Sequence, residues 1–121
     1  MYRLEFILHT TPLTLNEVMS KGWKPRHFNF EKVKDEIRLL TLGKRPEAPI
    51  KKASVYIRRF SPRKLDRDNF IFTFKPILDG LVGCGIIEDD GFDQVKRIDG
   101  EQVKCGAKEA RKIEVIVEEC Q

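Results

Sequence analysis

Hydrophobic and polar residues alternate along four parts of the chain in a way that predicts β-strands. Residues 2–9 (YRLEFILH) and 53–60 (ASVYIRRF) combine partial alternation with aromatic and β-branched side chains, which is typical of strands with one buried face. Residues 94–106 and 111–120 show a similar pattern near the end of the chain. The sequence therefore predicts two separated strands followed by two closing strands.

Two other stretches repeat apolar residues at the three- and four-residue spacing of an amphipathic helix. The first covers residues 27–44 and has Asn29 as a candidate N-cap. The second covers residues 68–81, with Asp68 or the asparagine after it as the N-cap. Pro76 lies inside the second stretch, and a proline removes one backbone hydrogen bond and clashes with the preceding turn. We therefore expect this helix to kink or to restart near Pro76.

The order of these elements predicts a single α+β domain over residues 1–121, with a mixed sheet packed against two main helices. Residues 10–26 contain two prolines and a glycine and are predicted to form an irregular loop. Hydrophobic residues make up 40% of the chain and charged residues 35%, which is enough for a modest core under a charged surface. The eight phenylalanines are assigned to the core rather than to base stacking.

Composition excludes several classes of protein and favours the cytoplasm. The three cysteines form no CxxC pair and are odd in number, which argues against a disulfide framework or a structural zinc site and fits a reducing compartment. No basic segment followed by an apolar leader begins the chain, and no run approaches ~20 apolar residues. We therefore expect no membrane partner.

Charge is distributed very unevenly, although the net charge is only +4. Residues 51–64 contain six Lys or Arg and no acid, whereas residues 88–93 contain four acids and no base. Asp66 and Asp68 follow the basic run directly, with one arginine between them. In an extended chain, residues two apart point the same way, so these two carboxylates would face one point.

The second predicted helix adds a polar stripe to this acidic pair. At about 100° per residue, Asp68, Lys75 and Asp79 fall on one side of a continuous helix. A lysine and an aspartate four residues apart can simply pair with each other. A lysine held near carboxylates can also contact a phosphate and stabilise developing negative charge.

Acids and bases in this order are the side chains that a metal-dependent nuclease needs. Mg²⁺ prefers carboxylate, water and phosphate oxygens, and a cationic surface attracts the nucleic-acid backbone that the acids would repel. Taken singly, the acid pairs are more typical of turns and helix caps, and the basic run of a solvated strand face. The basic residues assigned to DNA binding are Lys51, Lys52, Arg58, Arg59, Arg63, Lys64 and Arg67.

Three stretches in this order, LDRDN (65–69), KPILDGL (75–81) and GIIEDDGFDQV (85–95), carry a resemblance to a known family. The chain resembles the RusA family of Holliday junction resolvases, which are small endodeoxyribonucleases of bacteria and phages. PLTLN (12–16) and GWKPR (22–26) form a fainter match to the N-terminal segment of that family. The resemblance spans most of the chain.

The resemblance implies a RusA-like fold and a homodimer that binds four-way junctions or other branched DNA. It implies paired symmetric nicks made with Mg²⁺, or with Mn²⁺ in its place, in DNA recombination and repair. Asp66, Asp68 and Asp90 match the metal-binding aspartates, and Lys75 matches the catalytic lysine. Asp79 and Asp89 match additional acids.

One departure from the family pattern concerns Lys75, and two other interpretations of the chain are open. In some family members the lysine follows the second aspartate by four residues, whereas the gap here is seven. This moves Lys75 about one helical turn, or ~5 Å, along the axis. One alternative is a junction-binding or nucleic-acid-binding module of the same fold that does not cleave. Another is an interaction protein whose acids only cap helices and form turns.

Overall fold

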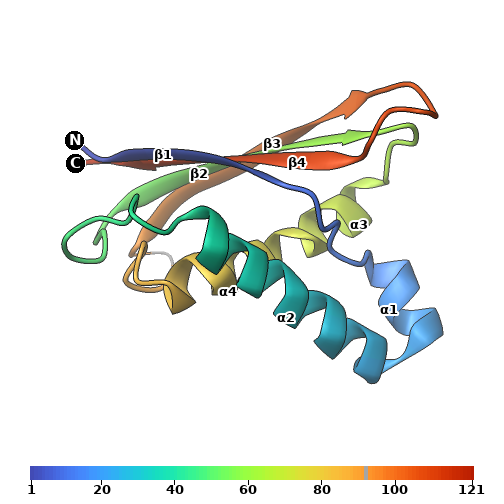
Figure 1. The fold of residues 1–121 in the computed structure, drawn as a ribbon, viewed down its shortest axis with the longest axis horizontal. Coiled ribbons are helices and arrows are strands. Elements are labelled where there is room, and N and C mark those ends of the chain that lie inside the picture. The colour runs from blue at the N-terminus through green and yellow to red at the C-terminus, as the bar shows by residue number, and fades with distance from the viewer. Residues whose placement is uncertain (92) are drawn as a thin grey trace.

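The computed structural model describes residues 1–91 and 93–121, which form a single α+β domain around a four-stranded mixed sheet (Figure 1). The strand order is β1-β4-β2-β3. β4 is antiparallel to both β1 and β2, whereas β3 is parallel to β2. All four predicted strands and the mixed sheet are therefore confirmed. Their bounds are Arg3–Leu8 for β1, Ala53–Ser61 for β2, Val95–Lys104 for β3 and Lys112–Glu119 for β4.

One face of the sheet is covered by the helices, and Figure 1 shows all of them on the same side of the strands. Every second residue of β2 is buried from Ala53 to Ser61, because alternate side chains of a strand point to opposite faces. Arg58 lies on the opposite, open face, where it forms ion pairs with Glu101 and Glu114. The core therefore lies between a single layer of helices and one side of the sheet.

The first predicted helix is confirmed as α2, Trp23–Leu40, although it begins four residues earlier than expected. Val33 and Ile37 of its apolar stripe are buried against α4, Phe74–Gly83. Gly80 allows the two helices to approach closely, because a Cβ at this position would lie 2.7 Å from Ile37 Cδ1. The two helices together form the main cover of the sheet.

The second predicted helix is divided into two, α3 (Arg67–Phe72) and α4, which meet at Thr73. Pro76 explains the break, because it has no N–H to donate to the carbonyl of residue 72 and its ring would clash there. The proline is the third residue of α4, and a missing donor is tolerated in the first turn of a helix. The expected restart near Pro76 is therefore confirmed.

The expectation of an irregular loop over residues 10–26 is wrong, because this segment contains the helix α1, Leu15–Lys21. Thr14 caps α1 and forms a capping box with Glu17, a Thr-x-x-Glu signal that is visible in the sequence. No residue of α1 is buried, so it lacks the apolar stripe that marks a helix. Asn29, expected as an N-cap, lies inside α2.

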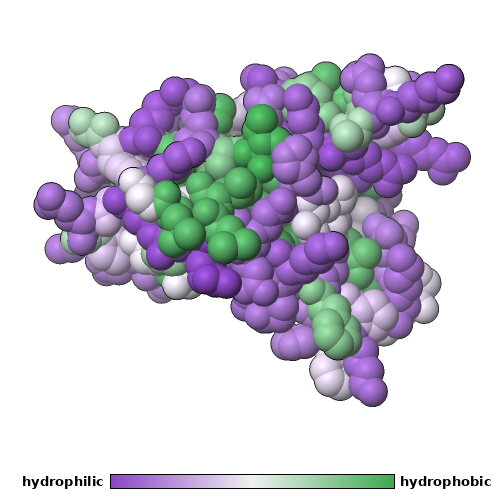
Figure 2. Space-filling view, in the orientation of Figure 1, coloured by the Kyte–Doolittle hydropathy of each residue, from purple (hydrophilic) through white to green (hydrophobic). Residues whose placement is uncertain are grey.

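Several large hydrophobic side chains lie on the surface. Phe28 is 75% exposed, so the assignment of all phenylalanines to the core is wrong. Figure 2 shows a largely hydrophilic face, whose most extensive apolar patch lies between the strands and the C-terminal end of α2. No helix among the described residues is long and apolar enough to cross a membrane. None of the three cysteines forms a disulfide.

Candidate functional site

Lys75, in the first turn of α4, lies between two carboxylates. Its Nζ is 2.9 Å from Asp79 Oδ1 and 2.9 Å from Asp90 Oδ2. The hydrogen bond from Lys75 lowers the pKa of Asp90, and the bonds to Asp90 and Asp79 raise the pKa of Lys75. The ammonium is therefore a cation held between two acids that are eleven residues apart in the chain.

The acidic turn reaches Lys75 because backbone bonds attach it to the segment before β2. Ile50 forms an isolated parallel bridge with Ile87, and the N–H of Ala53 donates to the carbonyl of Gln94. Asp90 lies between these attachments, and its own N–H donates to Asp89 Oδ1 at 2.8 Å. The loop after α4 therefore folds back toward the start of that helix. Phe92 of the same motif lies outside the described residues.

Asp66 is the N-cap of α3, where the sequence predicted Asp68 or Asn69. Its Oδ1 accepts hydrogen bonds from the backbone N–H and the side-chain Nδ2 of Asn69, both at 3.0 Å. Its second oxygen accepts from the same Nδ2 at 3.0 Å. These bonds, led by the backbone N–H, lower the pKa of Asp66. Asp66 is therefore a fixed and ionised carboxylate at the surface.

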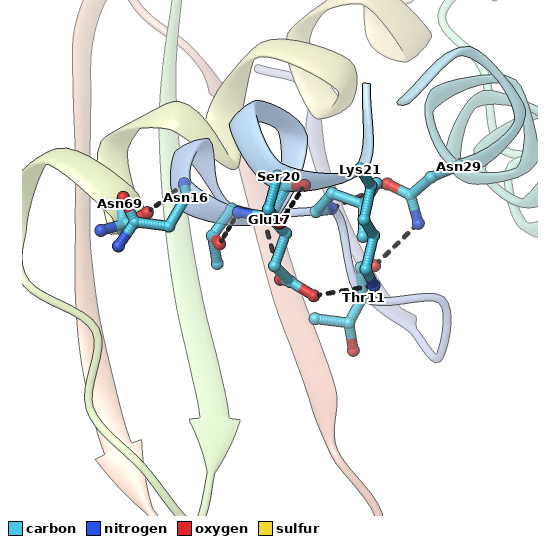
Figure 3. A network of polar contacts seen from close by, with 9 residues as sticks. Thr11, Asn16, Glu17, Ser20, Lys21, Asn29 and Asn69 are labelled. Atoms are coloured by element: carbon cyan, nitrogen blue, oxygen red, sulfur yellow. Dashed lines mark hydrogen bonds and ion pairs between the residues drawn. The ribbon is translucent and has the colours of Figure 1, made fainter. Parts of the chain in front are cut away.

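Asn69 connects the start of α3 to α1, and sequence reasoning considered it only as a helix cap. It is 6% exposed, and its Oδ1 accepts from the backbone N–H of Asn16 at 2.9 Å. Figure 3 shows this contact at one end of a polar network that continues through the capping box of α1 to Thr11 and Asn29. Asn29 donates to the carbonyl of Thr11 and accepts from Leu13 N. Asn69 therefore positions Asp66 and anchors α1.

Asp68 is exposed in the first turn of α3, and its carboxylate makes no hydrogen bond or ion pair with any described residue. The structure does not place it as the sequence suggested, because residues 66–68 are not one extended segment and Asp68 and Lys75 are not on one continuous helix. Thr73, at which α3 and α4 meet, lies between these two positions. Because Lys75 pairs with Asp79 and Asp90 and not with the acidic pair 66/68, the two are separate groups.

The donor chemistry of Asp66, Asp68 and Asp90 fits Mg²⁺, which takes oxygen ligands and commonly keeps several waters. Their arrangement does not form a closed cage. Among residues 1–91 and 93–121, no three His, Cys, Asp or Glu side chains are gathered in a way that could hold a metal ion. The cation that lies beside Asp90 is the ammonium of Lys75.

The basic residues assigned to DNA binding do not share one surface. Lys51 and Lys52 are exposed before β2, whereas Arg63, Lys64 and Arg67 are exposed after it. The nine residues of β2 separate these ends by about 30 Å. Each end of the strand therefore carries its own cationic group.

Arg59 differs from all of these residues because it is buried on the covered face of β2. It is 5% exposed, and its Nε and Nη1 are fully buried without a hydrogen-bond partner among the described residues. Nη2 is not among the fully buried atoms. Burial lowers the pKa of Arg59 and the positive charge of Arg111 adds to this effect, whereas the negative charge of Glu17 opposes it. An unpaired buried guanidinium is costly, so this residue is a candidate to bind an anion.

Comparison with known proteins adds no family to these observations. No family of known proteins matches the chain, and no curated protein has a matching sequence.

Proposed function

We propose that this protein is a Mg²⁺-dependent endonuclease, of the RusA type, that resolves Holliday junctions and other branched DNA by paired symmetric nicks. The observation that carries the proposal is the Lys75 ammonium held between Asp79 and Asp90, in the helix that follows the acidic pair 66/68 in the chain. The three sequence stretches that resemble the RusA family contain these same residues. Mn²⁺ is the expected substitute metal.

Asp66, Asp68 and Asp90 supply the oxygen donors that Mg²⁺ takes. Because they are not gathered around one position here, they would hold the metal only when it draws them together with a bound phosphate. The bound metal would supply a hydroxide and neutralise charge on the scissile phosphate. Lys75 would then contact the phosphate through an ammonium already positioned by two carboxylates. Asn69 keeps Asp66 in place through three hydrogen bonds. The exposed cations at the two ends of β2 would hold separate arms of the junction.

The test is cleavage of a synthetic four-way junction with and without Mg²⁺, using duplex and single-strand controls. Asp68→Asn should reduce nicking by more than the ~10–100-fold that is lost when a residue hydrogen-bonded to a metal ligand is removed. Junction affinity in a gel-shift assay should be nearly unchanged, because affinity depends on the basic residues. Asp35→Asn, an exposed acid of α2, is the matched control. Unchanged cleavage in Asp68→Asn would remove that residue from the mechanism.

One observation favours a second candidate function, a junction-binding module of the same fold that does not cleave. The described carboxylates are not gathered around one metal position, which is the arrangement expected if binding alone were needed. Titration with Mg²⁺ and Mn²⁺ separates the two functions. Tight junction binding without nicking at any metal concentration would favour the binding module.

A homodimer belongs to the leading proposal, because two symmetric nicks require two sites. Sedimentation equilibrium of the full chain should give twice the monomer mass. A monomer that nevertheless makes paired nicks would remove this part of the proposal.

A further inference from the structure

A shallow groove of about 270 Å³ lies on the helical side of the molecule, between α2 and α4. Trp23, Arg26, His27 and Phe30 of α2 line it, together with Asp79 of α4. Its volume is below the ~300–1,000 Å³ of pockets for drug-sized ligands. The groove is therefore suited to one flat group rather than to a large ligand.

Aromatic and basic side chains lie together in this groove. The Arg26 guanidinium lies 5.1 Å from the centroid of the Phe30 ring and 5.8 Å from that of Phe72. Trp23 is 70% exposed, although a large aromatic side chain gains free energy when it is covered. An exposed indole beside a stacked guanidinium is typical of surfaces on which nucleic-acid bases stack.

Charge in the groove favours a polyanion despite its two acids. Glu31 is paired with Lys34 at 2.9 Å, and Asp79 is paired with Lys75. Arg26 has no ion pair with any of the described carboxylates, so its charge remains available to a phosphate. Asp79 lines the groove and also contacts Lys75, so a strand lying in the groove would pass next to the candidate site.

We propose that this groove binds an unpaired nucleobase of single-stranded DNA, with the base stacked on Trp23 and an adjacent phosphate on Arg26. Bases in a duplex have both faces covered by their neighbours, whereas an unpaired base offers its face for stacking. The inference deepens the proposed nuclease function, because it assigns the recognition of unpaired strands at a branch point to these residues.

Trp23 is the single tryptophan of the chain, so its fluorescence reports directly on the groove. The full-length protein is titrated in EDTA with a 12-nucleotide oligothymidine and, separately, with a blunt 12-base-pair duplex. We expect the single strand to quench the fluorescence much more strongly than the duplex. Because stacking on one base is worth ~1–3 kcal/mol, Trp23→Ala should weaken binding of a labelled oligothymidine by about 5–150-fold in fluorescence anisotropy.

Variants define the role of the groove. Trp23→Phe should retain most of the affinity because it keeps an aromatic face, and Arg26→Gln should weaken binding. Phe28→Ala is the matched control, because Phe28 is also exposed on α2 but does not line the groove. The proposal is overturned if Trp23→Ala binds like the wild type or if the duplex quenches equally. It is also overturned if quenching depends on protein concentration without DNA, which would show that a second copy covers the groove.

Junction cleavage, measured separately with Mg²⁺, distinguishes the failure of this inference from that of the nuclease proposal. If the protein binds the single strand but cleaves no junction, the groove proposal stands and the nuclease proposal is wrong. If Trp23→Ala shows normal cleavage and normal single-strand affinity, only the groove proposal is wrong.

Discussion

At the scale of single residues, Arg59 is the side chain whose environment is least favourable for the stability of the fold. A buried donor without a partner costs about 1–3 kcal/mol, and more when it is charged. A residue kept at such a cost, on the strand that leads to the acidic pair, is best explained by a function. Under the proposed function, Arg59 would contact a phosphate of bound DNA through Nη2, which is not among its buried nitrogens without a partner.

This interpretation predicts opposite effects on stability and on binding. Arg59→Met removes the unpaired charge and keeps an apolar stem, so it should raise the free energy of unfolding in urea by about 1–3 kcal/mol. The same substitution should weaken junction binding. Arg58→Met, on the open face, is the control and should not stabilise the protein, because Arg58 is paired with Glu101. A loss of stability in Arg59→Met would mean that the guanidinium has a partner in solution.

The Lys75–Asp90 pair gives the protein a predictable response to pH. The pKa of Asp90 is lowered, so the stability from its charged form is present above the ordinary carboxyl value of about 3.9. It is lost as the pH falls through the lower folded value. The pKa of Lys75 is raised, so its contribution is present below about 10.4 and is lost as the pH rises through the higher folded value. The pair is therefore intact at neutral pH.

Lys75→Met tests this pair directly. It removes the main cause of the low pKa of Asp90, so a carboxyl titration by NMR should show that pKa rising toward its ordinary value. Lys64→Met, an exposed lysine at the far end of β2, should leave the pKa of Asp90 unchanged. If the two variants give the same Asp90 titration, the contact with Lys75 is not formed in solution.

The sequence indicated some contacts of the candidate site but not the arrangement of its residues. The pairing of Lys75 with Asp79 follows from helical spacing and is found. The burial of Arg59 was not anticipated, because the basic run was treated as one cationic surface and strand alternation was not applied to it. The roles of Asn69 and Asn16 depend on a contact between residues 53 apart in the chain, which no local pattern could indicate.

At the scale of elements, α3 links folding to the candidate chemistry, because the same carboxylate caps the helix and belongs to the acidic pair. Asparagine caps helices about as well as aspartate, whereas alanine does not. Asp66→Asn should therefore keep the urea midpoint of the wild type, and Asp66→Ala should lower it.

Cleavage should respond differently, because both substitutions remove the charge. We expect both variants to lose junction nicking, in contrast to their different stabilities. If Asp66→Asn nicks DNA normally, Asp66 serves only as a cap, which is the simplest alternative to the metal-binding role.

The helices show why hydrophobic periodicity in the sequence predicts some helices and misses others. α2 and the α3–α4 region were found because their buried residues recur at helical spacing, as Phe70, Phe74 and Ile77 do. α1 has no buried residue, so only its capping box distinguishes it from a loop. The division at Thr73 depends on Pro76, near which the sequence predicted a kink or a restart without choosing between them.

At the scale of the whole molecule, the order and type of the strands were predictable, but their neighbours were not. The sequence implied a mixed sheet, yet the central place of β4 between β1 and β2 results from pairing between distant segments. Because β2 and β3 are parallel, the chain must run from the acidic pair at the end of β2 back through α3 and α4 before β3 begins. Asp90 lies in the loop between α4 and β3, beside Lys75.

The same topology separates the exposed cations into two groups, and this separation predicts the salt dependence of junction binding. Each phosphate contact contributes about 0.9 to the slope of log affinity against log salt concentration. Lys51→Gln with Lys52→Gln, and Arg63→Gln with Lys64→Gln, should each reduce the slope by about 2. The combined variant should reduce it by about 4, because sites ~30 Å apart act independently. Lys32→Gln, an exposed lysine of α2, is the control and should leave the slope unchanged. If only one pair alters the slope, the junction contacts one end of β2, and the other cations serve solubility alone.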